Sequence, residues 1–213
     1  MNRNKKLGFL GLTAAIIAFS VVYGIGGTGQ APAVSPQRAA FIEADYAQQR
    51  DPYFCGQASI QMVLQMIQGK YVSQFRLHNE MNFIPGAGTR NIYMVGPFMN
   101  RDIEIIRNGP FSSQEHLRKS IEKGQYSIIN IRFDTESRSA HYVLVTGFNE
   151  TGFFVNDPWP EEWGEAIGRQ VGEHVYISNE LLQRLWAYRL NWVLTVAEQR
   201  IGNATLNMVE SGL

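Results

Sequence analysis

Cysteine is almost missing from this sequence of 213 residues: Cys55 is the only one, so no disulfide can form within the chain. In a protein that leaves the cytoplasm, cysteines are normally paired. A lone one is then a buried core residue, half of an intermolecular bridge or a reactive thiol. Composition alone favours the buried core residue. The position of Cys55 in the chain, described below, favours the reactive thiol.

Signatures of several function classes are also missing. There is no phosphate-binding loop, because the glycines of "GAGTRN" (residues 86–91) lack the preceding strand and following helix that such a loop needs. No histidines and cysteines stand at the spacing of a zinc site. We therefore predict neither a cofactor nor a metal ion.

The chain has no excess of basic residues. It contains 19 Lys and Arg against 19 Asp and Glu, and removing Arg3, Lys5 and Lys6 of the first 33 residues leaves 16 basic residues. A surface for nucleic acid or anionic lipid needs clustered Lys and Arg, so we expect neither as a partner. No repeat or low-complexity linker divides the rest of the chain, which favours one globular domain.

The N-terminus has the pattern of an export signal. The basic stretch "MNRNKK" precedes a run without charge from Leu7 to Ile25, and "APA" at residues 31–33 has the form of a signal-peptidase site. The run is close to the ~20 residues that span a bilayer. We therefore expect residues 1–33 to be a signal peptide or an N-terminal membrane anchor, and the protein to be secreted, periplasmic or anchored facing outside.

Cys55 lies at the predicted start of a helix. Apolar residues recur at helical spacing between Gly56 and Gln68, Gly69 is suited to the C-cap, and "RDPY" before Cys55 is a turn signal. Backbone N–H groups and the positive end of the helix dipole at this position stabilise a thiolate. Cys55 is therefore a candidate nucleophile.

One of the four histidines, His141, opens a predicted strand, "HYVLVTGF". The turn "NETG" and a second strand, "FFVNDPW", follow and form a hairpin that returns Asp157 to the neighbourhood of His141. A base oriented by an acid is what a thiol nucleophile needs. The alternative is that His141 is an ordinary residue at a strand edge and "NDP" an ordinary turn.

Taken together, "CGQASIQMVL", "HYVLVTGF" and "VNDPW" resemble the peptidase C39-like family, papain-type cysteine peptidases related to the bacteriocin-processing domains of peptide exporters. The resemblance covers roughly residues 46–192. The family has a glutamine six residues before its cysteine, which corresponds to Gln49. The resemblance implies that the amide of Gln49 joins the Cys55 backbone N–H in binding an oxyanion. "FSSQEHLRKSIEKGQYSIINIRF" resembles the family's helix, glycine turn and strand, and Ser112 with Glu115 predicts a capping box at that helix.

The sequence departs from the family pattern at two positions near the cysteine. Gln57 stands where the family usually has proline, and Phe54 where it often has aspartate. Neither position carries the chemistry. An ATP-binding loop and a multi-span membrane domain are missing as well, so we do not expect a bacteriocin exporter or assume cleavage after a double glycine.

These observations predict an α+β, papain-like fold with a linker at 34–45, the C39-like domain at 46–198 and a tail at 199–213. The nucleophile's helix packs on an antiparallel sheet, and Ser178 caps a further helix before the last strand. The expected strands are residues 126–133, 141–148, 152–156 and 190–196. Residues 78–110 and 158–175 are expected to supply loops around the groove.

The function implied is that of an exported cysteine peptidase acting on a peptide or protein. In this interpretation Cys55 attacks, His141 exchanges the proton, Asp157 orients His141 and Gln49 stabilises the oxyanion. Two alternatives remain open. One is a transglutaminase-like or other acyl-transfer enzyme that uses the same residues, and the other is a non-catalytic module that binds a peptide or partner. The sequence leaves the specificity and the oligomeric state open.

Overall fold

The structure is a computed structural model, and it describes residues 38–81, 88–164 and 166–198. The predicted signal or anchor at 1–33 and the predicted tail at 199–213 lie outside the described residues. Within the described part of the chain, no helix is both long and apolar enough to cross a membrane.

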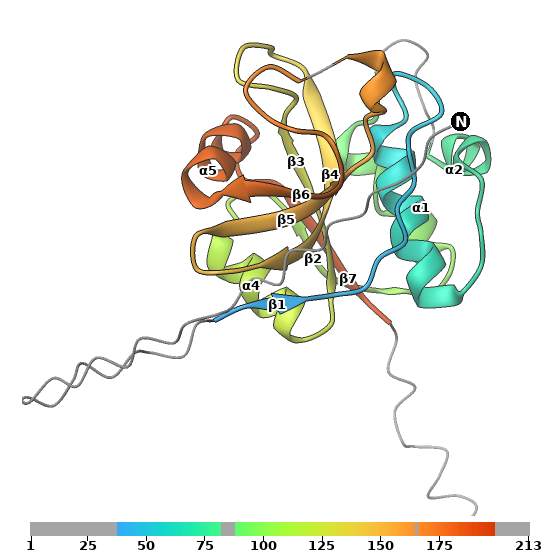
Figure 1. Ribbon diagram of the computed structural model, residues 1–213. Coiled ribbons are helices and arrows are strands. Elements are labelled where there is room, and N and C mark those ends of the chain that lie inside the picture. The colour runs from blue at the N-terminus through green and yellow to red at the C-terminus, as the bar shows by residue number, and fades with distance from the viewer. Residues whose placement is uncertain (1–37, 82–87, 165, 199–213) are drawn as a thin grey trace, which may run out of the picture. The chain divides into compact units, whose positions relative to one another are not determined.

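A single antiparallel sheet forms the centre of the domain (Figure 1). Six strands follow the order β2-β7-β3-β4-β5-β6, and the short β1 pairs with β4. The strands are β1 (Ala40–Phe41), β2 (Glu104–Gly109), β3 (Tyr126–Arg132), β4 (Ala140–Phe148), β5 (Gly152–Asp157), β6 (Gly172–Ser178) and β7 (Val193–Ala197). The structure therefore confirms the predicted α+β fold with an antiparallel sheet.

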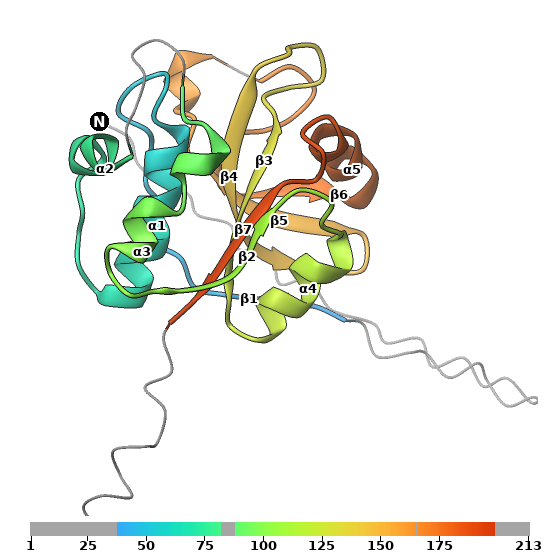
Figure 2. The same ribbon diagram turned by 180° about the vertical axis from the view of Figure 1, so that it is seen from behind.

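Helices cover the sheet from both sides, as the two opposite views show (Figures 1 and 2). One side carries α1 with α2 and α3, and the other carries α4 and α5. The helices are α1 (Cys55–Gln68), α2 (Gln74–Glu80), α3 (Gly96–Met99), α4 (Gln114–Glu122) and α5 (Asn179–Ala187), and short 3₁₀ helices occupy Asn91–Tyr93 and Glu161–Trp163.

Strand β4 is buried on both faces, which explains its continuous apolar sequence. Tyr142 and Leu144 belong to the core under α1, whereas Val143 and Val145 belong to the core under α4 and α5. This alternation follows from the two-residue period of a strand. The first residues of β4 therefore project from a rigid element beside the start of α1, and this junction positions the site described below.

Several local predictions are confirmed. Helix α1 begins at Cys55, and Gly69 ends it in the left-handed conformation with a φ of 62°. The hydroxyl of Ser178 accepts a hydrogen bond from the backbone N–H of Leu181, as expected of an N-cap. The hairpin of β4 and β5 pairs as predicted, with Leu144 opposite Asn156.

The predicted capping box at Ser112 is wrong by one residue. Ser113 is the N-cap of α4, and its hydroxyl accepts a hydrogen bond from the N–H of His116 at 3.1 Å. Glu115 instead forms an ion pair with Arg38 at 3.1 Å. Two adjacent serines offer the same local signal, and with Ser113 as the N-cap the third residue of the helix is His116 rather than Glu115, so no capping box forms.

Three strands lie where the sequence predicted loops or a linker. Strand β1 lies within the expected linker, β2 lies within residues 78–110, and β6 begins within residues 158–175 and extends beyond them. Strand β2 pairs with β7, and β6 pairs with β5, at the two edges of the sheet. Edge strands have one exposed side, and their apolar pattern is correspondingly weak: no residue of β2 is fully buried, and in β6 the alternation is limited to Val175 and Ile177 around the exposed Tyr176. Strand β7 also starts at residue 193 rather than 190, because Leu190 and Asn191 have positive φ angles in a tight turn.

Candidate active site

Cys55 is the first residue of α1, and its side chain faces a cavity. The preceding residue, Phe54, occupies the N-cap position and has no side-chain oxygen to cap the helix, and the first turn contains no acidic residue. The positive end of the helix dipole is therefore not neutralised by a neighbouring carboxylate. Such an environment stabilises a negatively charged sulfur atom.

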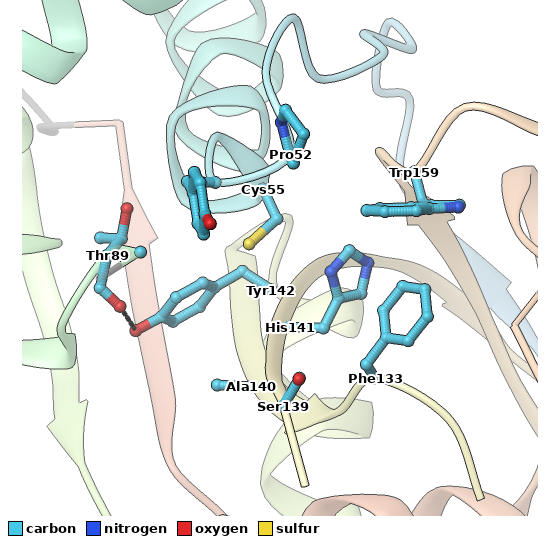
Figure 3. A pocket seen from close by; sticks show the side chains of 11 residues that line it. Pro52, Cys55, Thr89, Phe133, Ser139, Ala140, His141, Tyr142 and Trp159 are labelled. Atoms are coloured by element: carbon cyan, nitrogen blue, oxygen red, sulfur yellow. Dashed lines mark hydrogen bonds between the residues drawn. The ribbon is translucent and has the colours of Figure 1, made fainter. Parts of the chain in front are cut away.

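His141, the second residue of β4, lines the same cavity as Cys55, and its interaction with the Cys55 side chain helps to raise its pKa. Figure 3 shows the side chain of Cys55 at the start of its helix and the imidazole ring of His141 beside it. Nε2 of this ring lies 2.7 Å from Oδ1 of Asp157, which leaves Nδ1 for the thiol. Burial alone would lower the pKa of His141, but the charge of Asp157 and the contact with Cys55 outweigh burial and raise this pKa to about 9.

Asp157 is the last residue of β5 and is completely buried. The hairpin register brings it near His141, because Asn156 pairs with Leu144, and the next residue of β5 is then opposite Val143, two positions from His141. Burial opposes ionisation of Asp157, but the positive charges of His141 and Arg169 prevail and lower its pKa to about 2. The backbone N–H of Trp159 also donates to Oδ1 at 2.9 Å.

Gln49 is buried beside this group but does not contact it. Its backbone N–H donates to the carbonyl oxygen of Pro158 at 2.8 Å, next to Asp157, and its Nε2 donates to the carbonyl oxygen of Asp51 at 2.9 Å. The structure gives no hydrogen bond between Gln49 and either Cys55 or His141. A side-chain amide has two N–H donors, so one of them is left after the bond to Asp51. Of the four predicted site residues, three meet directly and Gln49 lies one step away.

A cavity of about 430 Å³ opens over Cys55 and His141. Its walls consist of aromatic and small residues. No Asp, Glu, Lys or Arg side chain lines the cavity. The lining residues besides Cys55 and His141 are Pro52, Tyr53, Gly88, Thr89, Phe133, Ser139, Ala140, Tyr142 and Trp159, most of them visible in Figure 3. Apart from the site residues Cys55 and His141, the cavity lining is therefore uncharged.

Two aromatic rings cover the imidazole. The ring centroid of Phe133 lies 5.3 Å from that of His141 at an interplanar angle of 90°, and the centroid of Trp159 lies 6.5 Å away at 80°. The two aromatic rings also contact each other edge to face. They shield the bond between His141 and Asp157 from water, which strengthens it.

The sequence profile of the Peptidase_C39 like family matches residues 41–179. The chain belongs to this family. Its papain-like fold agrees, and the family and fold imply a cysteine peptidase. No curated protein matches the sequence significantly.

Solved structures share the fold of this C39-like chain at low sequence identity. A crystal structure from Bacillus anthracis described as a C39-like peptidase has 15% identity and a TM-score of 0.61, and the match covers 76% of this chain and 98% of that one. The peptidase domain of Streptococcus ComA, a bi-functional ABC transporter involved in a quorum-sensing pathway, has 19% identity and a TM-score of 0.57, with 74% and 100% covered. A double glycine motif protease from an AMS/PCAT transporter, in complex with the leader peptide, has 17% identity and a TM-score of 0.55, with 74% and 92% covered.

Three residues of the C39-like site were not identified from the sequence as part of it. The tryptophan at the end of "VNDPW" is compatible with a subsite or with the edge of the core on sequence grounds, and nothing in the sequence marks Phe133 or Arg169 as functional. Arg169 lies in a stretch without helical or strand periodicity, yet its side chain is in ionic contact with Asp157. Only the packing of distant segments brings these residues together. Among the described residues, no group of three or more His, Cys, Asp or Glu could hold a metal ion.

Proposed function

We propose that this chain is a thiol-dependent peptidase that cleaves a peptide bond through Cys55, His141 and Asp157. The observation that carries the proposal is the continuous set of contacts from the Cys55 thiol through the imidazole to the buried carboxylate, at the floor of an open neutral cavity. A nucleophile, a base and a group that orients the base are the parts that covalent acyl transfer requires.

In the proposed reaction, His141 takes the proton of Cys55, and the sulfur attacks the carbonyl carbon of the substrate. The carbonyl π electrons move to the oxygen, and the resulting oxyanion accepts hydrogen bonds from the backbone N–H of Cys55 and the amide of Gln49. The C–N bond then breaks, and the imidazolium gives its proton to the leaving amine. Water, deprotonated by His141, attacks the thioester and releases the acid and the thiol.

A peptide is the proposed substrate class. The neutral lining of the cavity supports this, as does the fold neighbour that is a protease in complex with a leader peptide. We also propose that the domain works outside the cytoplasm, because residues 1–33 have the pattern of a signal peptide or anchor.

The test is cleavage of a fluorogenic peptide library by residues 34–213, beside the variants Cys55→Ser and Ser59→Ala. Ser59 is a buried residue one turn further along α1 and serves as the matched control. We expect cleavage by the parent chain and by Ser59→Ala, and none by Cys55→Ser. Equal cleavage by Cys55→Ser, or none by any variant over the whole library, would refute the proposal. Cross-linked product in the presence of added amines would assign the same site to acyl transfer instead of hydrolysis.

A further inference from the structure

Arg169 is a buried cation in direct contact with the acid of the site. Its side chain is only 1% exposed, and Nη1 donates both to Oδ2 of Asp157 and to the carbonyl oxygen of Gln170. Nε donates to the carbonyl oxygen of Phe133, whose ring covers His141. Arg169 thus links the acid to the wall of the cavity.

The contacts of Asp157 are divided between its two oxygens. Oδ1 accepts from His141 and from the N–H of Trp159, and Oδ2 accepts from Arg169. With both oxygens held, the carboxylate has one orientation, and the imidazole that is bonded to it has one as well. A buried charge is tolerated when it is paired and hydrogen-bonded in this way.

The loop that carries Arg169 is fixed against the loop after β3. The backbone N–H and the hydroxyl of Thr135 both donate to the carbonyl oxygen of Ile167, each at 2.9 Å. Gly168 has a φ of 79°, and a Cβ atom at this position would lie 2.6 Å from Oγ1 of Thr135. Close approach of the two loops therefore needs glycine, and it places the guanidinium from a defined direction.

We propose that Arg169 is a positioning residue that holds Asp157 and, through its charge, sets the proton balance between Cys55 and His141. This inference rests on the proposed function, because the balance matters for a thiol nucleophile. Arg169 is not itself among the residues that line the cavity, and it acts on the site through its bonds to Asp157 and Phe133.

The physical reason is that Arg169 and Asp157 form a neutral pair. Without the cation, Cys55 and His141 would face an uncompensated buried carboxylate. The negative charge would disfavour the thiolate and favour the imidazolium, so both groups would lose their protons at higher pH.

Other charged and titratable groups also lie near Arg169. Asp134 faces it from the loop after β3, and Glu161, Glu173 and His174 line a surface cavity with it. The hydroxyl of Tyr46 donates to the backbone carbonyl of Asp157 at 2.9 Å. None of these groups bonds to the carboxylate of Asp157, so Arg169 is the cation that balances it.

The experiment measures the rate of Cys55 alkylation by iodoacetamide against pH. Because Cys55 is the only cysteine, the label reports one site. In Arg169→Met we expect the lower midpoint of the profile to move up by about one pH unit or more, the effect of one nearby charge. Arg169→Lys keeps the charge and should keep the midpoint. Arg132→Met is the matched control, since Arg132 bonds to the carbonyl oxygens of Asp134 and Thr135 in the same loop but not to Asp157.

If circular dichroism shows that Arg169→Met is unfolded, a second pair of variants replaces it. This pair is the single variant Asp157→Asn and the double variant Asp157→Asn with Arg169→Met. This pair leaves no unpaired buried carboxylate, and the double variant should have the higher midpoint. Equal midpoints within either pair, or the same shift in Arg132→Met, would refute the role of Arg169. The expected shifts without any peptide cleavage would refute the peptidase function alone, and cleavage with unchanged midpoints would refute the inference alone.

Discussion

Asp157→Asn should lower and narrow the pH range of activity, and the structure gives the size of the effect. Asp157 contributes to the raised pKa of His141, about 9 instead of the ordinary 6.5. At pH 8 a group with a pKa of about 9 is about nine-tenths protonated, and one with a pKa of 6.5 about one-thirtieth. The imidazolium that pairs with the thiolate would therefore become about 30-fold rarer. In this variant burial and the unopposed Arg169 cation would lower the pKa of His141, whereas the interaction with Cys55 would still raise it, so about 30-fold is the scale of the effect.

The assay is the pH profile of kcat/KM for a cleaved peptide, whose alkaline limb reports the imidazolium of the free enzyme. In Asp157→Asn this limb should move from near pH 9 to about pH 6.5 or below. The matched control is Asp134→Asn, because Asp134 is another nearly buried acid and its carboxylate accepts hydrogen bonds from Glu136 and Ser137 in its own turn, with no bond to His141. An alkaline limb that stays in place in Asp157→Asn would show that another group sustains the imidazolium and would refute the reasoning.

Two further outcomes follow from the site. Gln49→Ala should lower kcat by roughly 10²- to 10³-fold with little change in substrate affinity, because an oxyanion donor acts in the transition state. The control Gln48→Ala should leave kcat almost unchanged, and loss of affinity at constant kcat in Gln49→Ala would contradict this role. The free energy of unfolding, measured in urea at different pH values, should decline as the pH falls from about 3.8 to about 2, because folding lowers the pKa of Asp157 to about 2. It should also decline as the pH rises from 6.5 through about 9, because folding raises the pKa of His141 to about 9. A flat profile through both ranges would contradict the coupling of this pair.

The elements that the sequence predicted correctly are those whose signals are local. Helix α1 starts at Cys55 because a turn signal precedes an apolar helical pattern, and α5 starts after Ser178 because serine caps it within three residues. Asp157 approaches His141 through a hairpin with a short turn, so that the register follows from a few consecutive residues. In each case the residues that fix the structure lie within about twenty positions of one another in the chain.

What the tertiary structure decided depends on residues far apart in the sequence. The edge strands β2 and β6 form because β7 and β5 offer free hydrogen-bonding edges, and their sequences carry at most the short alternation of Val175 and Ile177 in β6. The amide of Gln49 bonds to Asp51 in the described structure, whereas the family resemblance supplied only its position. The sequence around Arg169 does not identify it as a site residue. Its role depends on a carboxylate on β5 and a carbonyl oxygen after β3, which only folding brings close to it. Hydrogen bonds and ion pairs between separate loops are set by the packing of the whole sheet, and a short stretch of sequence does not encode that packing.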